Sequence, residues 1–192
     1  MAKEKQILVY KNSYWLSEIG ALFFKYQVGY EVYDYSENAS MVDDGIDLMV
    51  LNSQNIPTTV LCMGNTFPWE KIFFPIIENG EQSRLMTSKA DFVFFYDINQ
   101  GGVSLIDLPL LQEKINYNYT QGAWKDYKVA EKGNLKGIQV SKEDKIIKEA
   151  LTTYQLKPDV WDKALRIIKW RQKQTKVNES KELDTIEKIV KS

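Results

Sequence analysis

Three short apolar runs separated by turn residues constrain the fold of this chain more than any other feature. They cover residues 45–51, 59–63 and 92–96. Short continuous apolar runs between turn signals are typical of strands that are covered on both faces. The sequence therefore predicts an α/β protein with a central sheet between two layers. Asp44 and Asp47, at the opening of the first run, predict carboxylates at one end of a central strand.

The remaining elements follow from periodicity and from start and stop signals. Ser13 can cap a first helix, whose apolar residues recur every three or four positions, and Ser141 with Asp144 gives a second start signal. Residues 67–78, which include Pro68 and Pro75, are expected to be irregular or to form short strand pieces, and residues 36–43 a loop. We expect helices over residues 13–28, 110–115, 141–154, 158–176 and 181–191, and strands over 30–35, 45–51, 58–63, 92–96, 103–108, 124–130 and 137–140.

Length and charge predict one core with a helical tail. The chain has 192 residues, of which 44% are hydrophobic and 27% charged, and no apolar run approaches the roughly 20 residues that cross a bilayer. The N-terminus lacks the features of a signal peptide, so we expect a cytoplasmic protein. We place an α/β core at residues 1–140, with 12 Lys and Arg against 17 Asp and Glu, and a mildly basic helical extension at residues 141–192, with 13 against 9.

Two residue counts limit the chemistry. The chain has no histidine, which excludes Ser-His-Asp and Cys-His nucleophiles and the usual histidine-containing zinc sites. Its single cysteine, Cys62, leaves no internal disulfide, and its apolar surroundings predict a buried, inert thiol. Any reaction must therefore depend on carboxylates, lysines, tyrosines or a bound metal.

One order of residues suggests a metal site. Glu18 lies on the first predicted helix, Asp47 on the strand 45–51, and residues 87–91 lead into an aromatic strand. In this order the chain resembles the PD-(D/E)XK nuclease superfamily, in particular its small phage-type and resolvase-like members, over roughly residues 13–140. In that family a glutamate and a strand aspartate hold a divalent cation, and a lysine on the next strand orients the nucleophile.

The resemblance implies a fold, a cofactor and partners. It implies a three-layer, restriction-endonuclease-like core with a mixed central sheet, followed here by the C-terminal helical extension. It also implies Mg²⁺ or Mn²⁺ as the cofactor of an endonuclease of phage or mobile-element origin, with nucleic acid, most naturally DNA, as the substrate. Resolvase-like relatives are often dimers, so the resemblance implies a homodimer as well. The matching residues are Glu18 and Asp47, as metal ligands and catalytic residues. Lys89 does not stand at the family's lysine position, but it is the candidate for the catalytic lysine.

The chain departs from the family at the acidic-x-lysine triplet. Fifteen residues after Asp47 stands Cys62 instead of an acid, and the lysine position is Gly64. Two pairs are candidates to replace the triplet: Glu70 with Lys71, and Lys89 with Asp91. Either such a pair restores a working endonuclease, or the chain is a catalytically degenerate relative that still binds nucleic acid, or the fold is a different one.

The same residues also have plain structural interpretations. Asp47 can be a strand-end aspartate that bonds to a turn, and Glu18 a surface residue of an amphipathic helix. Lys89 and Asp91, at the start of a strand, can form a local ion pair.

Basic residues recur on the helix predicted at 158–176. Lys163, Arg166, Lys169 and Lys173 follow at intervals of three and four, with Trp170 beside them. Such a stripe can bind a phosphate backbone and stack a base, although a solvated surface helix shows the same pattern. The alternative function is a non-enzymatic protein-interaction module on an inactive nuclease-like scaffold, which binds a partner protein through this tail or through aromatic residues. Those aromatic residues are Tyr30, Tyr33, Tyr35, Tyr117, Tyr119 and Trp124.

Overall fold

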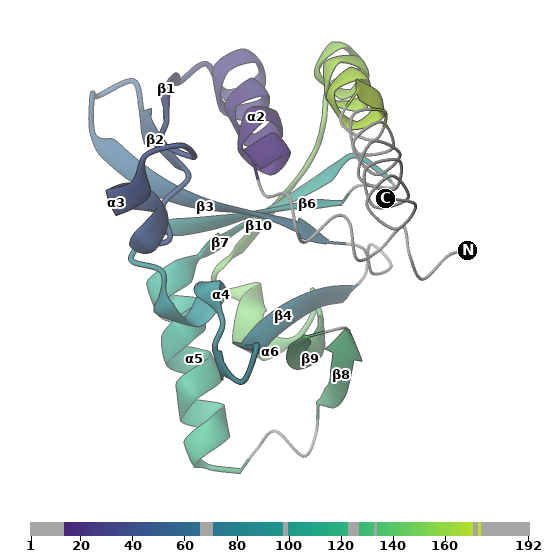
Figure 1. Ribbon diagram of the computed structural model, residues 1–192. Helices are drawn as coiled ribbons and strands as arrows, with labels where there is room; N and C mark the ends of the chain where they lie inside the picture. The colour runs from purple at the N-terminus through teal and green to yellow at the C-terminus, as the bar shows by residue number, and fades with distance from the viewer. Residues whose placement is uncertain are drawn as a thin grey trace, which may run out of the picture.

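Two β-sheets and the helices around them make up the fold (Figure 1). The computed structural model describes residues 14–65, 71–97, 100–122, 127–132, 134–170 and 173. The larger sheet is mixed, with strand order β1-β2-β3-β6-β7-β10, and the smaller is antiparallel, with order β5-β4-β9-β8. The strands of the larger sheet are β1 (Glu31–Asp34), β2 (Leu48–Leu51), β3 (Pro57–Asn65), β6 (Phe92–Asp97), β7 (Gly102–Asp107) and β10 (Leu151–Gln155). Those of the smaller sheet are β4 (Lys71–Glu78), β5 (Glu81–Gln82), β8 (Lys128–Lys132) and β9 (Leu135–Ser141).

The helices are short apart from three. They are α2 (Tyr14–Leu22), which continues into the π-helix η1 (Phe23–Val28), and then α3 (Ala39–Asp43), α4 (Arg84–Thr87), α5 (Leu108–Thr120) and α6 (Lys145–Lys148). Residues 158–170 form a last helix, called here the C-terminal helix. No helix among the described residues is long and apolar enough to span a membrane.

The larger sheet owes its mixed character to one crossover. β1, β2 and β3 are antiparallel neighbours, whereas β6 pairs with β3 in parallel, with Cys62 opposite Phe94. A parallel pair needs a long connection, and here β4, β5 and α4 provide it on one face of the sheet. β7 and β10 then extend the sheet in antiparallel fashion.

Two apolar cores lie on opposite faces of the larger sheet, which gives three layers (Figure 1). On one face α2, η1 and the C-terminal helix cover residues such as Leu48 and Phe94. On the other face α4, α5, α6 and the smaller sheet enclose residues such as Leu61 and Phe95. The α/β class and the mixed central sheet predicted from the sequence are therefore confirmed.

Several predicted elements differ in the structure. Residues 67–78 were expected to lack a long strand, but β4 is eight residues long and pairs with β9. The segment 36–43 contains α3, and the helix predicted at 110–115 extends over all of α5.

The helix predicted at 141–154 is wrong. A single turn, α6, follows Asp144, and the chain then forms β10 against the free edge of β7. Threonine and tyrosine favour strands, and the pairing with β7 outweighs the local helix signal. The predicted boundary at 140/141 falls at the end of β9, and the residues after it are not helical throughout. The helix predicted at 158–176 is confirmed for residues 158–170, and that predicted at 181–191 lies outside the described residues.

Candidate functional site

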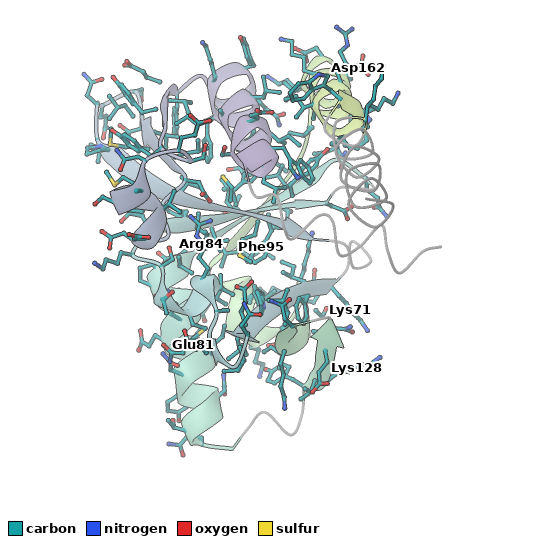
Figure 2. The ribbon with its side chains drawn as sticks, in the orientation of Figure 1. Lys71, Glu81, Arg84, Phe95, Lys128 and Asp162 are labelled. Carbon is teal, nitrogen blue, oxygen red and sulfur yellow. The ribbon has the colours of Figure 1, made fainter. Side chains whose placement is uncertain are left out.

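Asp47 is a buried carboxylate held by an ion pair. Asp47 immediately precedes β2, and the residue is 2% exposed. Arg84 donates to both carboxylate oxygens, from Nη2 to Oδ1 at 2.8 Å and from Nη1 to Oδ2 at 3.2 Å. The backbone N–H of Cys62 donates to Oδ2 at 2.7 Å. Figure 2 shows Arg84 between α4 and the larger sheet. Both oxygens of Asp47 therefore already have charge-assisted or backbone partners.

The strand geometry explains the bond between Asp47 and Cys62. In the register of β2 and β3, Leu48 stands opposite Val60, and the ladder between the two strands ends there. The N–H of Asp47 still donates to the carbonyl of Val60 at 2.9 Å, but the chain before it turns away at Gly45, whose φ is 72°. The Asp47 carboxylate thus accepts the Cys62 N–H that a continued strand would have paired with a carbonyl.

Gly45 is required at this turn. A Cβ atom there would lie 2.6 Å from the Cβ of Ser88, and the positive φ disfavours other residues. The Ser88 hydroxyl donates to the Gly45 carbonyl at 2.8 Å, and the N–H of Lys89 donates to the carbonyl of Asp44 at 2.9 Å. The turn before β2 and the loop after α4 therefore hold each other in place, which aligns Arg84 with Asp47.

The positions at which the resemblance would place the acidic-x-lysine triplet carry no charge. Cys62 and Gly64 are buried on β3, and the Cys62 side chain belongs to the core under α2. A Cβ on Gly20 of α2 would lie only 3.0 Å from the Cys62 sulfur, so the helix packs directly over this position. Burial raises the pKa of the Cys62 thiol well above its usual value, and the Asp47 carboxylate adds to the effect. The predicted buried thiol at Cys62 is confirmed.

Lys89 and Glu18 lie elsewhere. Lys89 is 71% exposed, and its Nζ lies 2.6 Å from Oδ1 of Asp44 on the surface. Glu18 is half-buried on α2, and its neighbour Ser17 donates to Asp34 of β1 at 3.4 Å on the α2 side of the sheet. Arg84 reaches Asp47 from α4, which packs on the other side. Within the described residues, no group of three or more acidic, cysteine or histidine side chains is arranged to hold a metal ion.

The pairs considered as replacements for the triplet have these positions. Asp91 accepts the N–H and the hydroxyl of Thr59 at 2.7 and 2.8 Å, and so fixes the start of β6 to β3. Lys71 is exposed on β4, in the smaller sheet (Figure 2), and Glu70 lies outside the described residues.

Sequence reasoning missed Arg84, the partner of Asp47. It stands 37 residues further along the chain, on a single helical turn, and no local pattern links it to a carboxylate. A buried aspartate needs a partner. Its burial therefore indicates that a cation approaches it, but does not identify that cation.

A second candidate site lies on the C-terminal helix. Val160, Ala164 and Ile168 face the core. The opposite side exposes all four basic residues predicted for nucleic-acid binding, together with Trp170, which is 51% exposed. The structure thus brings Lys163, Arg166, Lys169 and Lys173 together on one surface.

The π-helix adds two residues to this surface. The spacing of apolar residues in the first predicted helix also includes Tyr26 and predicts that it is buried, but its side chain is 49% exposed. The wider winding of η1 rotates the residues after Phe24 away from the positions that an α-helix would give them. Lys163 Nζ lies 4.0 Å from the centre of the Tyr26 ring, and Lys25 Nζ lies 5.7 Å from it. We call the following set the basic face: Lys25, Tyr26, Lys163, Arg166, Lys169, Trp170 and Lys173.

Comparison of the chain with protein-family models, curated proteins and solved structures gives no match.

Polar contacts fix the two parts of the basic face relative to each other. The side chain of Gln27 in η1 donates to the Gln155 carbonyl at 2.9 Å and accepts the N–H of Lys157 at 2.9 Å. Gln27 therefore joins η1 to the start of the C-terminal helix. A surface held in this way loses less conformational entropy when a ligand binds.

The charge of the basic face contrasts with that of the whole chain. The basic face carries five cations. The C-terminal helix also carries two acids, Asp159 and Asp162, of which Figure 2 labels Asp162. The complete chain has a net charge of −1. The basic face lies on the helix layer, on the opposite side of the sheet from the Asp47–Arg84 pair.

The aromatic residues considered for protein binding are dispersed. Tyr33 is 39% exposed on β1, and Tyr117 is 64% exposed on α5. Tyr30 and Tyr35 are half-buried, whereas the Tyr119 side chain and Trp124 lie outside the described residues.

Proposed function

We propose that this protein binds nucleic acid without hydrolysing it, on a restriction-endonuclease-like scaffold in which the metal-binding aspartate has become part of a structural ion pair. The observation that carries the proposal is the basic face, together with the use of both Asp47 oxygens by Arg84 and Cys62.

The order of elements supports the scaffold. α2 carries Glu18 and precedes the antiparallel strands β1, β2 and β3, and Asp47 lies at the start of β2. This is the order that the resemblance to PD-(D/E)XK nucleases implies. The three layers and the mixed sheet agree with it.

The loss of hydrolysis follows from the surroundings of Asp47. A divalent cation would have to compete with the Arg84 guanidinium for a carboxylate that is 2% exposed. The cation would also lack a second acid on β3, where Cys62 and Gly64 stand. The metal-dependent hydrolysis that the resemblance implies needs a cation to activate water and stabilise the developing charge, and these residues do not provide its ligands.

The basic face provides the binding. Lysine and arginine side chains on one exposed surface release counterions from a nucleic acid when they contact its phosphates, and this release supplies most of the non-specific affinity. Arg166 and Lys169 are exposed, and the helix that carries them is anchored in the core by residues such as Ala164.

A matched pair of variants tests the proposal. In the first, Lys163, Arg166, Lys169 and Lys173 are replaced by glutamine. In the control, four exposed lysines of the opposite layer, Lys128, Lys136, Lys145 and Lys148, are replaced by glutamine. The two variants have the same net charge, and Lys128 lies on the smaller sheet, far from the C-terminal helix (Figure 2).

Fluorescence anisotropy with a labelled oligonucleotide measures the binding. We expect the first variant to lose binding and the control to retain it, and we expect the wild type to leave the oligonucleotide intact in Mn²⁺. Equal binding by both variants would argue against the basic face. Cleavage that disappears in Asp47→Asn would show a working metal site. Absence of binding by the wild type would favour the protein-interaction alternative.

A further inference from the structure

The two aromatic side chains of the basic face, Tyr26 and Trp170, are about half exposed to solvent. Trp170 of the C-terminal helix and Tyr26 of η1 are 51% and 49% exposed, whereas Val160, Ala164 and Ile168 on the opposite side of the C-terminal helix are buried in the core. Large aromatic side chains in the middle of a charged surface offer flat apolar area to a ligand.

Cations flank the indole along the helix axis. Lys163, Arg166, Trp170 and Lys173 follow at intervals of three, four and three residues, which places them in one row on the helix. At a rise of 1.5 Å per residue, the row is about 15 Å long, with Trp170 between Arg166 and Lys173. Lys163 also lies over the Tyr26 ring, so its ammonium links the row to η1.

An exposed aromatic ring with cations on both sides can stack on unpaired bases. In a duplex the flat faces of the bases are already stacked on one another, so an exposed ring on a helix has no base face to contact. In a single strand the bases can unstack and lie on an aromatic side chain while neighbouring cations contact the phosphates. We propose that the basic face binds single-stranded nucleic acid, with Trp170 stacking on a base and Lys163, Arg166 and Lys173 contacting the backbone. This inference rests on the proposed function and names its substrate class.

The test compares oligo-dT alone with oligo-dT annealed to oligo-dA, by fluorescence anisotropy with the full chain. We expect tighter binding to the single strand. We also expect log Kd to change by about 2 for each tenfold change in salt, as three contacted phosphates predict for a single strand.

Two variants isolate the ring. Trp170→Leu keeps an apolar residue with good helix propensity but removes the ring, whereas Trp170→Phe retains one. Stacking of one base on an aromatic residue predicts roughly 5- to 150-fold weaker binding of oligo-dT by Trp170→Leu, and a much smaller loss for Trp170→Phe. Duplex binding should be the same in both variants. Circular dichroism and thermal melting confirm that each variant is folded.

The outcomes separate this inference from the proposed function. Equal or tighter binding of the duplex, with no effect of Trp170→Leu, would overturn the single-strand inference and leave nucleic-acid binding in place. Absence of binding to either probe by the wild type would overturn both. A selective loss of single-strand binding in Trp170→Leu would support both.

Discussion

Replacement of Asp47 by alanine should destabilise the protein, because the carboxylate connects three parts of the fold. It joins β2 to the N–H of Cys62 on β3 and to the guanidinium of Arg84 on α4. The alanine variant leaves the Cys62 N–H buried without its acceptor and leaves Arg84 without its counter-ion.

The magnitude follows from these two losses. A buried N–H without an acceptor costs about 1 to 3 kcal/mol. An unpaired charge in a buried pair costs about 3 to 5 kcal/mol, but the Arg84 side chain is 28% exposed and can be partly hydrated, so its share is smaller. We expect the free energy of unfolding to fall by about 3 kcal/mol in total, and Tm to fall by about 6 to 12 °C for a chain of this length.

A series of variants tests the reasoning by thermal and denaturant unfolding. Asp47→Asn retains an oxygen acceptor for Cys62 and should lose only about 1 to 2 kcal/mol. Arg84→Met should be the worst, because it leaves a carboxylate that is 2% exposed without its cation. The double variant Asp47→Ala with Arg84→Met removes both charges but still leaves the Cys62 N–H without its acceptor. It should be more stable than Arg84→Met alone, which would appear as a large coupling energy in the double-mutant cycle.

One result would refute this account. Carboxylates that hold a catalytic metal are usually costly to the empty fold, so their removal often stabilises a protein. If Asp47→Ala raised Tm, and if isothermal titration showed Mn²⁺ binding by the wild type that the variant lost, Asp47 would be a metal ligand. The proposal that this protein does not hydrolyse nucleic acid would then be wrong.

Other perturbations have equally definite outcomes. The Tyr96 hydroxyl is buried and has no hydrogen-bond partner among the described residues. Tyr96→Phe should therefore leave the free energy of unfolding, measured by urea denaturation, unchanged or raise it. A loss above about 1 kcal/mol would contradict this. Burial raises the pKa values of Tyr96 and Cys62 in the folded state, so these groups lose their protons at a lower pH in the unfolded chain. The free energy of unfolding should therefore decline as pH rises above about 9. A free energy of unfolding that stays constant from pH 8 to 11 would contradict this. The Cys62 thiol should react with a disulfide reagent only after unfolding, and rapid reaction of the native protein would be evidence of local opening. Gly137→Ala should be strongly destabilising, because a Cβ atom would lie 2.0 Å from the carbonyl oxygen of Phe74, whereas Gly122→Ala, where a Cβ meets nothing, shows the cost of a positive φ alone.

Part of the fold could be predicted because its signals are local. The apolar runs at 59–63 and 92–96 became β3 and β6, and the intervals of Lys163, Arg166 and Lys173 placed them on one side of a helix. These predictions require only the periods of strands and helices, which depend on the backbone. The strand β10 was missed because its pairing with the edge of β7 is not visible in its own residues.

The sequence by itself determined which chemistry is possible and where the central strands and the basic row lie. It did so because histidine content, apolar runs and side-chain intervals are properties of neighbouring residues. Only the tertiary structure decided that Asp47 pairs with Arg84, and that the Tyr26 ring is exposed and lies against the Lys163 ammonium. The first contact depends on the crossover that brings α4 beneath β2, and the second on the π-helical winding of η1. Both depend on how separate segments pack together, and neither can be read from the residues of one segment.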